Sequence, residues 1–193
     1  MNCKIKVGKN MRTTIAACVM FAILLVGCSG NSEPSEHVHN SARFKITIPA
    51  GWKLISEDDE MFEFRKGDTR LIEVGRFELD FTPDEMADME DDEITEMLEQ
   101  SSDGGFKSYC IDARISDYRI EQQNSRVWGG LPAYYIKARG FSNEIDESVV
   151  IDLLIAIHRD RCAMYLFASQ VTRSNYEKTE QHIKSSIESF QVI

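Results

Sequence analysis

The stretch DYRIEQQNSRVWGGLPAYYIKARG, residues 117–140, decides the fold of this chain. Two runs that favour β-structure lie on either side of Gly129 and Gly130, and glycine supplies the positive backbone torsion angles that tight hairpin turns need. Pro132 sets a sharp start to the second run. The pattern therefore predicts two antiparallel strands joined by a short turn.

Two more strands are predicted after this hairpin. They are SVVIDLLIAIHRD, residues 148–160, and RCAMYLFASQVT, residues 161–172, and the tight turn around Asp160 favours pairing between them. Residues 153–157, LLIAI, are apolar at every position. Since side chains alternate between the two faces of a strand, this one is expected to be central in the sheet and covered on both sides.

The chain closes with a predicted helix over residues 174–190. Ser174 and Glu177 have the spacing of a capping box, and the apolar residues recur at helical spacing on one face. Such a face is expected to pack on the sheet.

Strand patterns also precede the hairpin. Residues 43–55, RFKITIPAGWKLI, alternate apolar and polar side chains, and residues 61–79 give two further strands joined around Gly67. A helix is predicted over residues 82–100. The order strands, helix, strands, helix indicates an α+β domain, an antiparallel β-sheet flanked by helices.

The first helix has clear start and stop signals. Thr82 and Glu85 have the spacing of a capping box, and Asp103-Gly104-Gly105 is expected to end the helix. The acidic run at residues 88–93 lacks the glycine turn and ligand spacing of a calcium loop, so it is interpreted as the solvated face of this helix.

The N-terminal segment has the pattern of a bacterial lipoprotein precursor. Residues 1–27 combine a basic start with a short apolar run, and Leu25-Val26-Gly27-Cys28 resembles the site at which a signal peptidase cuts before a lipidated cysteine. The alternative is a short membrane anchor with an incidental cysteine. Lipid on Cys28 predicts a location in the cell envelope, and Ser29 favours the outer membrane if the host is Gram-negative.

Removing this leader makes the chain more acidic. Residues 1–27 carry four positive and no negative charges, so the formal net charge falls from −10 to −14. Such a chain repels phosphate backbones, which argues against nucleic acid as a partner. Residues 28–42 are polar and predict a flexible tether, and residues 43–193 have the length of a single domain.

Two cysteines, Cys110 and Cys162, lie in the predicted domain. An envelope location permits a disulfide between them, and the alternative is two buried small side chains. A Cys-x-x-Cys redox motif is absent from the sequence.

Candidates for chemistry are few. His37 and His39 alternate on the predicted tether and are weak candidates for a metal site, so no metal or other cofactor is expected. Nucleophile-elbow and phosphate-loop motifs are absent, and His158 and His182 are interpreted as structural or surface residues. The sequence therefore predicts a protein that is not an enzyme.

A resemblance to a known family supports this interpretation. The segments FKITIPAGWKL, GGLPAYYIKARG and IKSSIESFQV are similar to landmarks of the PsbP-like superfamily, which includes DcrB-type envelope lipoproteins. The resemblance spans roughly residues 43–193. It implies an α/β/α sandwich used mainly to bind other macromolecules.

The expected function is that of a lipid-anchored module that binds or assembles an envelope protein. An aromatic strip of Trp128, Tyr134, Tyr135 and Phe141 could line a groove, although alternation sends Tyr134 and Tyr135 to opposite faces. The alternative function is a carrier of a small molecule or metal ion, with its pocket between sheet and helix.

Overall fold

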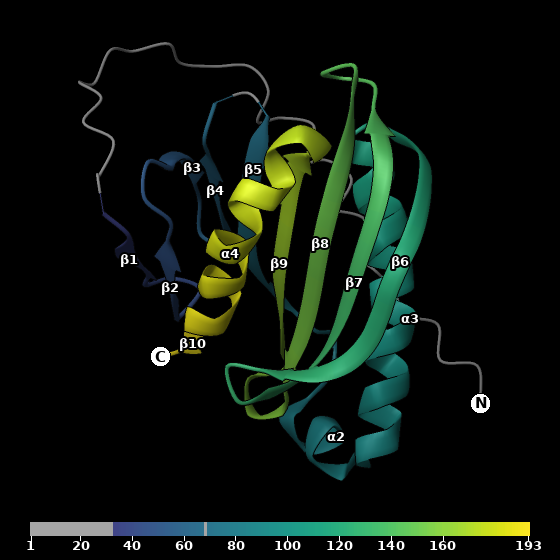
Figure 1. Ribbon diagram of the computed structural model, residues 1–193. Coiled ribbons are helices and arrows are strands. Elements are labelled where there is room, and N and C mark those ends of the chain that lie inside the picture. The colour runs from purple at the N-terminus through teal and green to yellow at the C-terminus, as the bar shows by residue number, and fades with distance from the viewer. Residues whose placement is uncertain (1–32, 68) are drawn as a thin grey trace.

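The computed structural model describes residues 33–67 and 69–193 (Figure 1). The predicted signal peptide and the lipidation site Cys28 lie outside these residues. Within the described part of the chain, no helix combines the length and apolarity needed to cross a bilayer.

The domain is built on a seven-stranded, fully antiparallel sheet. In spatial order its strands are β3 (Lys53–Glu57), β4 (Met61–Arg65), β5 (Arg70–Glu78), β9 (Ala163–Thr172), β8 (Glu147–His158), β7 (Leu131–Ser142) and β6 (Ile115–Trp128). The predicted hairpin is β6–β7. Gly129 and Gly130 have φ angles of 57° and 83°, as the mirror-image two-residue turn requires.

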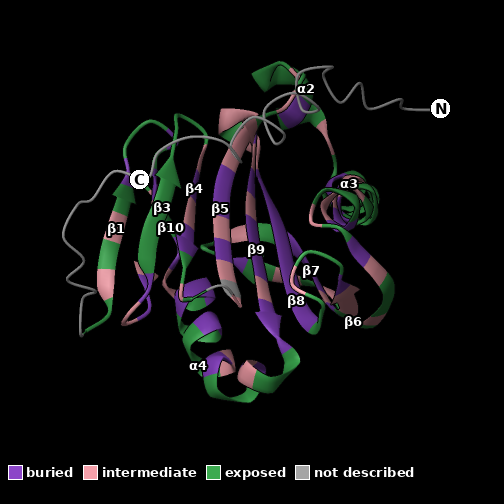
Figure 2. Ribbon diagram, turned by 90° about the horizontal axis from the view of Figure 1, so that it is seen from above, coloured by how far each residue is buried: buried purple, intermediate pink, exposed green. Residues whose placement is uncertain are grey.

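Helices cover both faces of this sheet. Helix α4 (Arg173–Ser189) packs on β8 and β9, and α3 (Asp91–Asp112) packs on β6, β7 and β8 from the other side (Figures 1 and 2). Each helix encloses its own apolar core. The prediction of an α+β domain with a helix-flanked antiparallel sheet is confirmed.

Strand β8 lies in the interior of the sheet and is covered on both faces, as its apolar sequence predicts. Residues 149–157 are all buried, because β7 and β9 flank the strand and a helix covers each face (Figure 2). One charged side chain, Asp152, lies within this buried run.

The predicted first helix is two helices. Thr82 and Glu85 form the expected capping box at the start of α2 (Pro83–Asp88), and Glu90 and Glu93 form a second one that starts α3. The prediction that α3 ends at residues 103–105 is wrong. A side chain at Gly105 would come within 3.3 Å of Ile155 Cδ1, so the glycine permits close packing on β8 without breaking the helix.

The start of α4 also differs from the prediction. The helix begins at Arg173 with Thr172 as its N-cap, so the predicted capping box of Ser174 and Glu177 does not form. Asn175 and Ser174 instead make side-chain hydrogen bonds with the Thr172 hydroxyl.

Part of the predicted tether is ordered. Residues 35–39 form strand β1 (Ser35–His39), which pairs with β2 (Phe44–Ile48) in a small sheet completed by β10 (Gln191–Val192). The segment has few apolar residues, but His39 stacks on Phe44 and supplies the missing contact with the core. The domain therefore begins before residue 43.

The two cysteines are free thiols. An ion pair of 2.6 Å between Arg159 and Asp91 holds the turn that precedes Cys162 beside the start of α3. Cys110 lies about 19 residues further along α3, which at ~1.5 Å per residue is roughly 28 Å away. A disulfide needs Cα atoms within about 7 Å, so the fold keeps the two cysteines apart.

We predict that denatured protein takes up two alkyl labels on Cys110 and Cys162 without prior reduction. Burial raises the pKa of the Cys110 thiol to about 11, so native protein should react slowly at this position. Intact mass spectrometry with and without reductant measures both results. A mass that gains these labels only after reduction would contradict the arrangement.

The partly buried carboxyl group of Glu73 gives a pH-dependent prediction. Burial, and then the charge of Glu63 directly opposite on β4, raise the pKa of Glu73 to about 7. A raised carboxyl pKa favours the folded state at low pH, and this contribution is lost as pH rises from about 4.5 to 7. Relative to Glu73→Gln, the wild type should lose about 3 kcal/mol of stability over that range.

Urea unfolding at pH 4 and pH 8 measures this difference. Glu177→Gln on the exposed side of α4 is the matched control and should show no comparable pH dependence. A Glu73→Gln difference that stays constant between the two pH values would contradict the assignment.

Candidate binding cleft between the sheet and helix α4

A row of polar side chains crosses the α4 face of the sheet. Lys137 of β7 lies directly opposite Asp152 of β8, and Asp152 lies directly opposite Ser169 of β9. Gln122 of β6 extends the row on the other side of Lys137. On β8 and β9 the neighbouring positions on this face are apolar and belong to the core.

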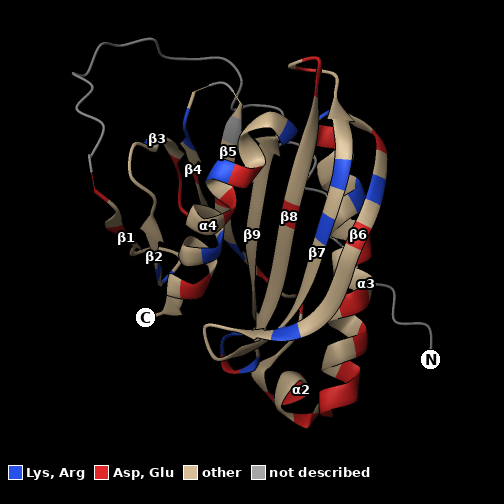
Figure 3. Cartoon of the chain, viewed as in Figure 1, with Lys and Arg blue, Asp and Glu red and all other residues tan. Residues whose placement is uncertain are grey.

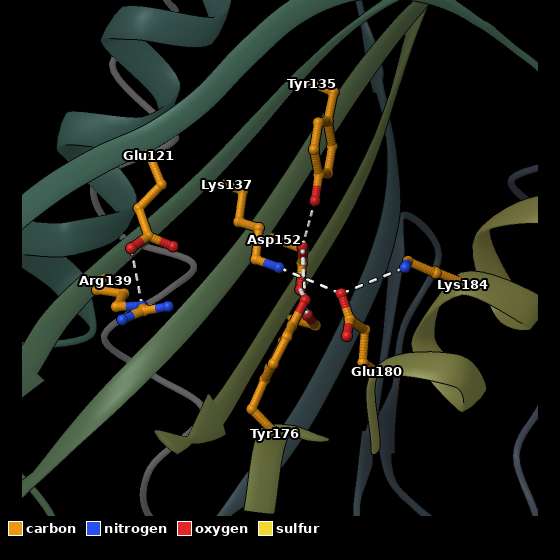
Figure 4. A network of polar contacts seen from close by, with 9 residues as sticks. Glu121, Tyr135, Lys137, Arg139, Asp152, Tyr176, Glu180 and Lys184 are labelled. Carbon is orange, nitrogen blue, oxygen red and sulfur yellow. Dashed lines mark hydrogen bonds and ion pairs between the residues drawn. The ribbon is translucent and has the colours of Figure 1, made fainter. Parts of the chain in front are cut away.

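Asp152 is the centre of this row and is only 2% exposed. Its Oδ1 accepts a hydrogen bond of 2.5 Å from the Tyr135 hydroxyl, and its Oδ2 accepts one of 3.2 Å from Ser169. The Tyr176 hydroxyl of α4 lies 3.1 Å from Oδ2 (Figure 4). The carboxyl group thus joins β7, β9 and α4 at one point.

Burial has the largest effect on the pKa values of Asp152, Tyr135 and Tyr176. It raises the pKa of Asp152 even though the hydrogen bonds from Tyr135, Tyr176 and Ser169, and the charge of Lys137, act to lower it. Burial, followed by the charge of Asp152, also raises the pKa of both tyrosines. The tyrosines therefore stay protonated and act as hydrogen-bond donors.

Charged groups surround the buried carboxyl at the rim. Glu180 Oε1 of α4 lies 3.3 Å from Lys137 Nζ and 3.3 Å from Lys184 Nζ. Burial acts to raise the pKa of Glu180, but these two hydrogen bonds outweigh it and the pKa is lowered. The guanidinium carbon of Arg126 lies 3.9 Å from the centroid of the Tyr135 ring and makes a cation–π contact with it.

A cleft of about 290 Å³ opens above this network, between β6, β7 and α4. Its walls include Arg126, Tyr135, Lys137, Glu180 and Lys184. The cleft is at the small end of the range for small-molecule sites. It is the kind of pocket between sheet and helix that the carrier alternative requires.

The hydrogen bonds of Asp152 hold two tyrosines of the cleft wall in place. Each oxygen of Asp152 already accepts hydrogen bonds from protein hydroxyls, and the group is almost fully buried. A general base must reach the proton that it removes. Asp152 is therefore a structural residue that positions Tyr135 and Tyr176.

The histidine candidates lie elsewhere. His37 and His39 both project from β1 toward the aromatic core, where His37 contacts the edges of Phe62 and Phe64. His39 Nδ1 accepts a hydrogen bond of 3.1 Å from the Ala42 amide. Glu57 Oε1 lies 3.5 Å from His37 Nε2, and among the described residues no three His, Cys, Asp or Glu side chains are grouped so that they could hold a metal ion.

The aromatic strip divides between the two faces, as alternation predicts. Trp128 and Tyr135 belong to the α4-side core, and Tyr134 belongs to the α3-side core. Tyr135 lines the cleft, and Phe141 lines a second cavity on the same face. The strip therefore does not form one continuous groove.

The basic residues of this face do not stand out in the sequence. They are Arg119, Arg126, Lys137, Arg139, Arg173 and Lys184, which line the two cavities beside α4. Figure 3 shows the contrast with α3, along which acidic residues gather. Alternation along β7 gave a signal, because Lys137 and Arg139 are two positions apart. Arg119 and Arg126 of β6 are seven positions apart and share this face only because the strand register shifts between them. α4 contributes Arg173 and Lys184 from a distant part of the sequence.

Comparison with known proteins agrees with the fold. No family model matches the sequence, and no curated protein matches it. The Saccharomyces cerevisiae Ran-binding protein Mog1p has a similar structure, with a TM-score of 0.56 at 10% identity over 84% of this chain and 96% of its own.

Two further solved structures are similar. Cyanobacterial PsbP (CyanoP) from Synechocystis has a TM-score of 0.51 at 13% identity over 89% of this chain and 99% of its own. LpqN, involved in cell envelope biogenesis of Mycobacterium tuberculosis, has a TM-score of 0.56 at 10% identity over 83% of this chain and 90% of its own. At such identities the likeness establishes the architecture alone. This chain has an α+β fold of the Mog1 and PsbP type.

Proposed function

We propose that this chain is a non-enzymatic, lipid-anchored lipoprotein of the cell envelope and that its domain binds a partner protein as an assembly module. The lipid is attached to Cys28, and Ser29 favours the outer membrane in a Gram-negative host. The leader pattern supports the anchor, and the envelope role of the similar LpqN supports the location.

The open edge of β6 is the observation that carries the proposal. β6 is the last strand of the large sheet, and Gln122–Trp128 pair with β7 in regular register. The outer backbone groups of an edge strand can pair with an extended segment of another chain. Val127, 73% exposed, lies on this edge.

The charges beside this edge indicate the chemistry of the partner. Arg126 lies on the edge strand itself, and Lys137 lies on the neighbouring strand at the cleft. An extended segment of the partner with acidic side chains on one face would match both.

The opposite edge of the sheet is less suited to strand addition. β3 has five residues and its register shifts between Leu54 and Ser56, whereas seven consecutive residues of β6, Gln122–Trp128, pair without a shift. Irregularities of this kind discourage pairing with another chain. Ile55 on β3 is 56% exposed and gives a matched control position.

Site-specific crosslinking in intact cells tests the binding surface. A photo-crosslinking residue at position 127 should capture one dominant envelope protein, whereas the same residue at position 55 should not. Capture of the same protein with equal yield at both positions, or of none at position 127, would contradict the proposed surface.

The anchor is tested separately by cell fractionation. Wild-type protein should sediment with membranes, and Cys28→Ser should release it, because acyl chains supply the membrane affinity. Cys110→Ser is the control and should remain in the membrane fraction. A Cys28→Ser protein that still sediments fully would overturn the anchor.

A second candidate function is a carrier for a small molecule, and the cleft of about 290 Å³ favours it. Native mass spectrometry of protein purified from its host tests this directly. A bound mass that is lost in Tyr135→Ala would support the carrier, while a spectrum of bare protein counts against it.

A further inference from the structure

A second cavity on the α4 face is lined by three arginines. It has a volume of about 250 Å³ and lies between β6, β7, β8 and the start of α4. Arg119, Arg139 and Arg173 line it, together with Asp117 and Ser148. The chain as a whole has 22 basic and 32 acidic residues, so this local excess of positive charge is unusual for the molecule.

The backbone brings two of these arginines together. Arg119 of β6 lies directly opposite Arg139 of β7, and like charges in this relation destabilise a pair of strands. The strands are also held very close. A side chain at Gly140 would lie 2.5 Å from Ile115 Cγ2, and the register of β6 shifts between Ser116 and Arg119.

The third arginine lies at an unfavourable place on α4. Arg173 is the first residue of the helix, where the positive end of the helix dipole repels a cation. The first turn contains no acidic residue that would compensate for it. The helix end and its arginine therefore add to the positive charge at the cavity.

The protein neutralises little of this charge. Arg139 Nε donates to Glu121 at 2.8 Å, which orients the guanidinium and leaves its terminal amino groups for other partners. Among the described residues, no carboxylate lies within ion-pair distance of Arg119 or Arg173. Asp117 is exposed at the rim, so Asp117 and Glu121 supply two negative charges against the three positive charges of the arginines.

We propose that this cavity binds a phosphate group. Planar guanidinium groups match the oxygens of phosphate, and a dianion satisfies several arginines at once where a single carboxylate would not. The volume is on the order of eight water molecules, which leaves room for part of the molecule that carries the phosphate. A phosphate ester, soluble or as a lipid headgroup, fits this chemistry. The site does not depend on the proposed partner protein.

Titration of the purified full-length protein with inorganic phosphate tests the site. At constant ionic strength, arginine side-chain NMR signals should shift in a saturable way. Arg119→Gln and Arg173→Gln should each weaken binding at least tenfold. Lys178→Gln, an exposed position on α4 with the same loss of charge, should change it less than twofold.

The source of the phosphate is separated by two probes. Tighter binding of glycerol 3-phosphate than of inorganic phosphate indicates a soluble ester, and binding only to vesicles that contain phosphatidylglycerol indicates a headgroup. No saturable binding of any probe, or equal weakening by all three substitutions, would overturn the site. Tighter binding of hexaglutamate than of every phosphate probe would overturn the assignment to phosphate. The test of the partner-binding surface, crosslinking at position 127, is independent of all these results.

Discussion

Replacing Trp128 by alanine should lower the free energy of unfolding by about 4 kcal/mol, within the range for buried aromatic residues. Trp128 is 2% exposed and stacks on Phe190 at a centroid distance of 3.9 Å. Its indole Nε1 donates a hydrogen bond of 2.6 Å to the Ile187 carbonyl. The substitution removes the contact that joins the end of the β6–β7 hairpin to the end of α4.

Two conservative variants separate packing from the hydrogen bond. Trp128→Phe keeps an aromatic ring but leaves the Ile187 carbonyl without its donor, which should cost about 1–3 kcal/mol beyond the change in packing. Trp52 is also buried, but its indole N–H has no hydrogen-bond partner among the described residues. Trp52→Phe should therefore cost less. Urea unfolding measures the stability loss of all three variants. A loss below about 1 kcal/mol for Trp128→Ala would contradict the packing of Trp128 on Phe190.

Replacing Asp152 by alanine should cost about 3 kcal/mol. The carboxyl group accepts hydrogen bonds from Tyr135, Tyr176 and Ser169, so its removal leaves three buried hydroxyl groups without their acceptor. The tyrosines also form part of the cleft wall. The variant should lose stability, and the backbone amides of β7 and α4 at the cleft should exchange their hydrogens faster than in the wild type.

The conservative variant Asp152→Asn gives a pH-dependent control. Because burial raises the pKa of Asp152, the folded state favours the neutral carboxyl group. Its contribution to stability is present at low pH and is lost as pH rises from the unfolded value through the raised folded value. The stability of the wild type relative to Asp152→Asn should therefore fall with rising pH. A difference that grows with pH would show that the carboxylate is the favoured form.

Local patterns predicted most of the sheet. The Gly129-Gly130 turn predicted the β6–β7 hairpin, and the apolar run 153–157 identified a strand that is covered on both faces. These signals depend on residues that are close in the sequence. The helix stop at Gly104-Gly105 failed because packing of Gly105 against Ile155 overrode the low helix propensity of glycine.

The residues of the candidate site could not be grouped from local sequence patterns, because the strand register and the helix packing bring them together. Lys137, Asp152 and Ser169 form one polar row only because three strands pair in a particular register, and Tyr176 joins them from a helix. Each residue alone resembles an ordinary interruption of an apolar strand. Similarly, His39 could be assigned to the core only once Phe44 and Phe62 were known to lie beside it.

In-cell crosslinking from position 127, done in both the wild-type and the Cys28→Ser background, tests the anchor and the binding surface together. A lipid-anchored binding module predicts one dominant protein partner in the wild type and loss of that partner when the anchor is removed. No partner in either background, or the same partner at equal yield in both, would contradict the account.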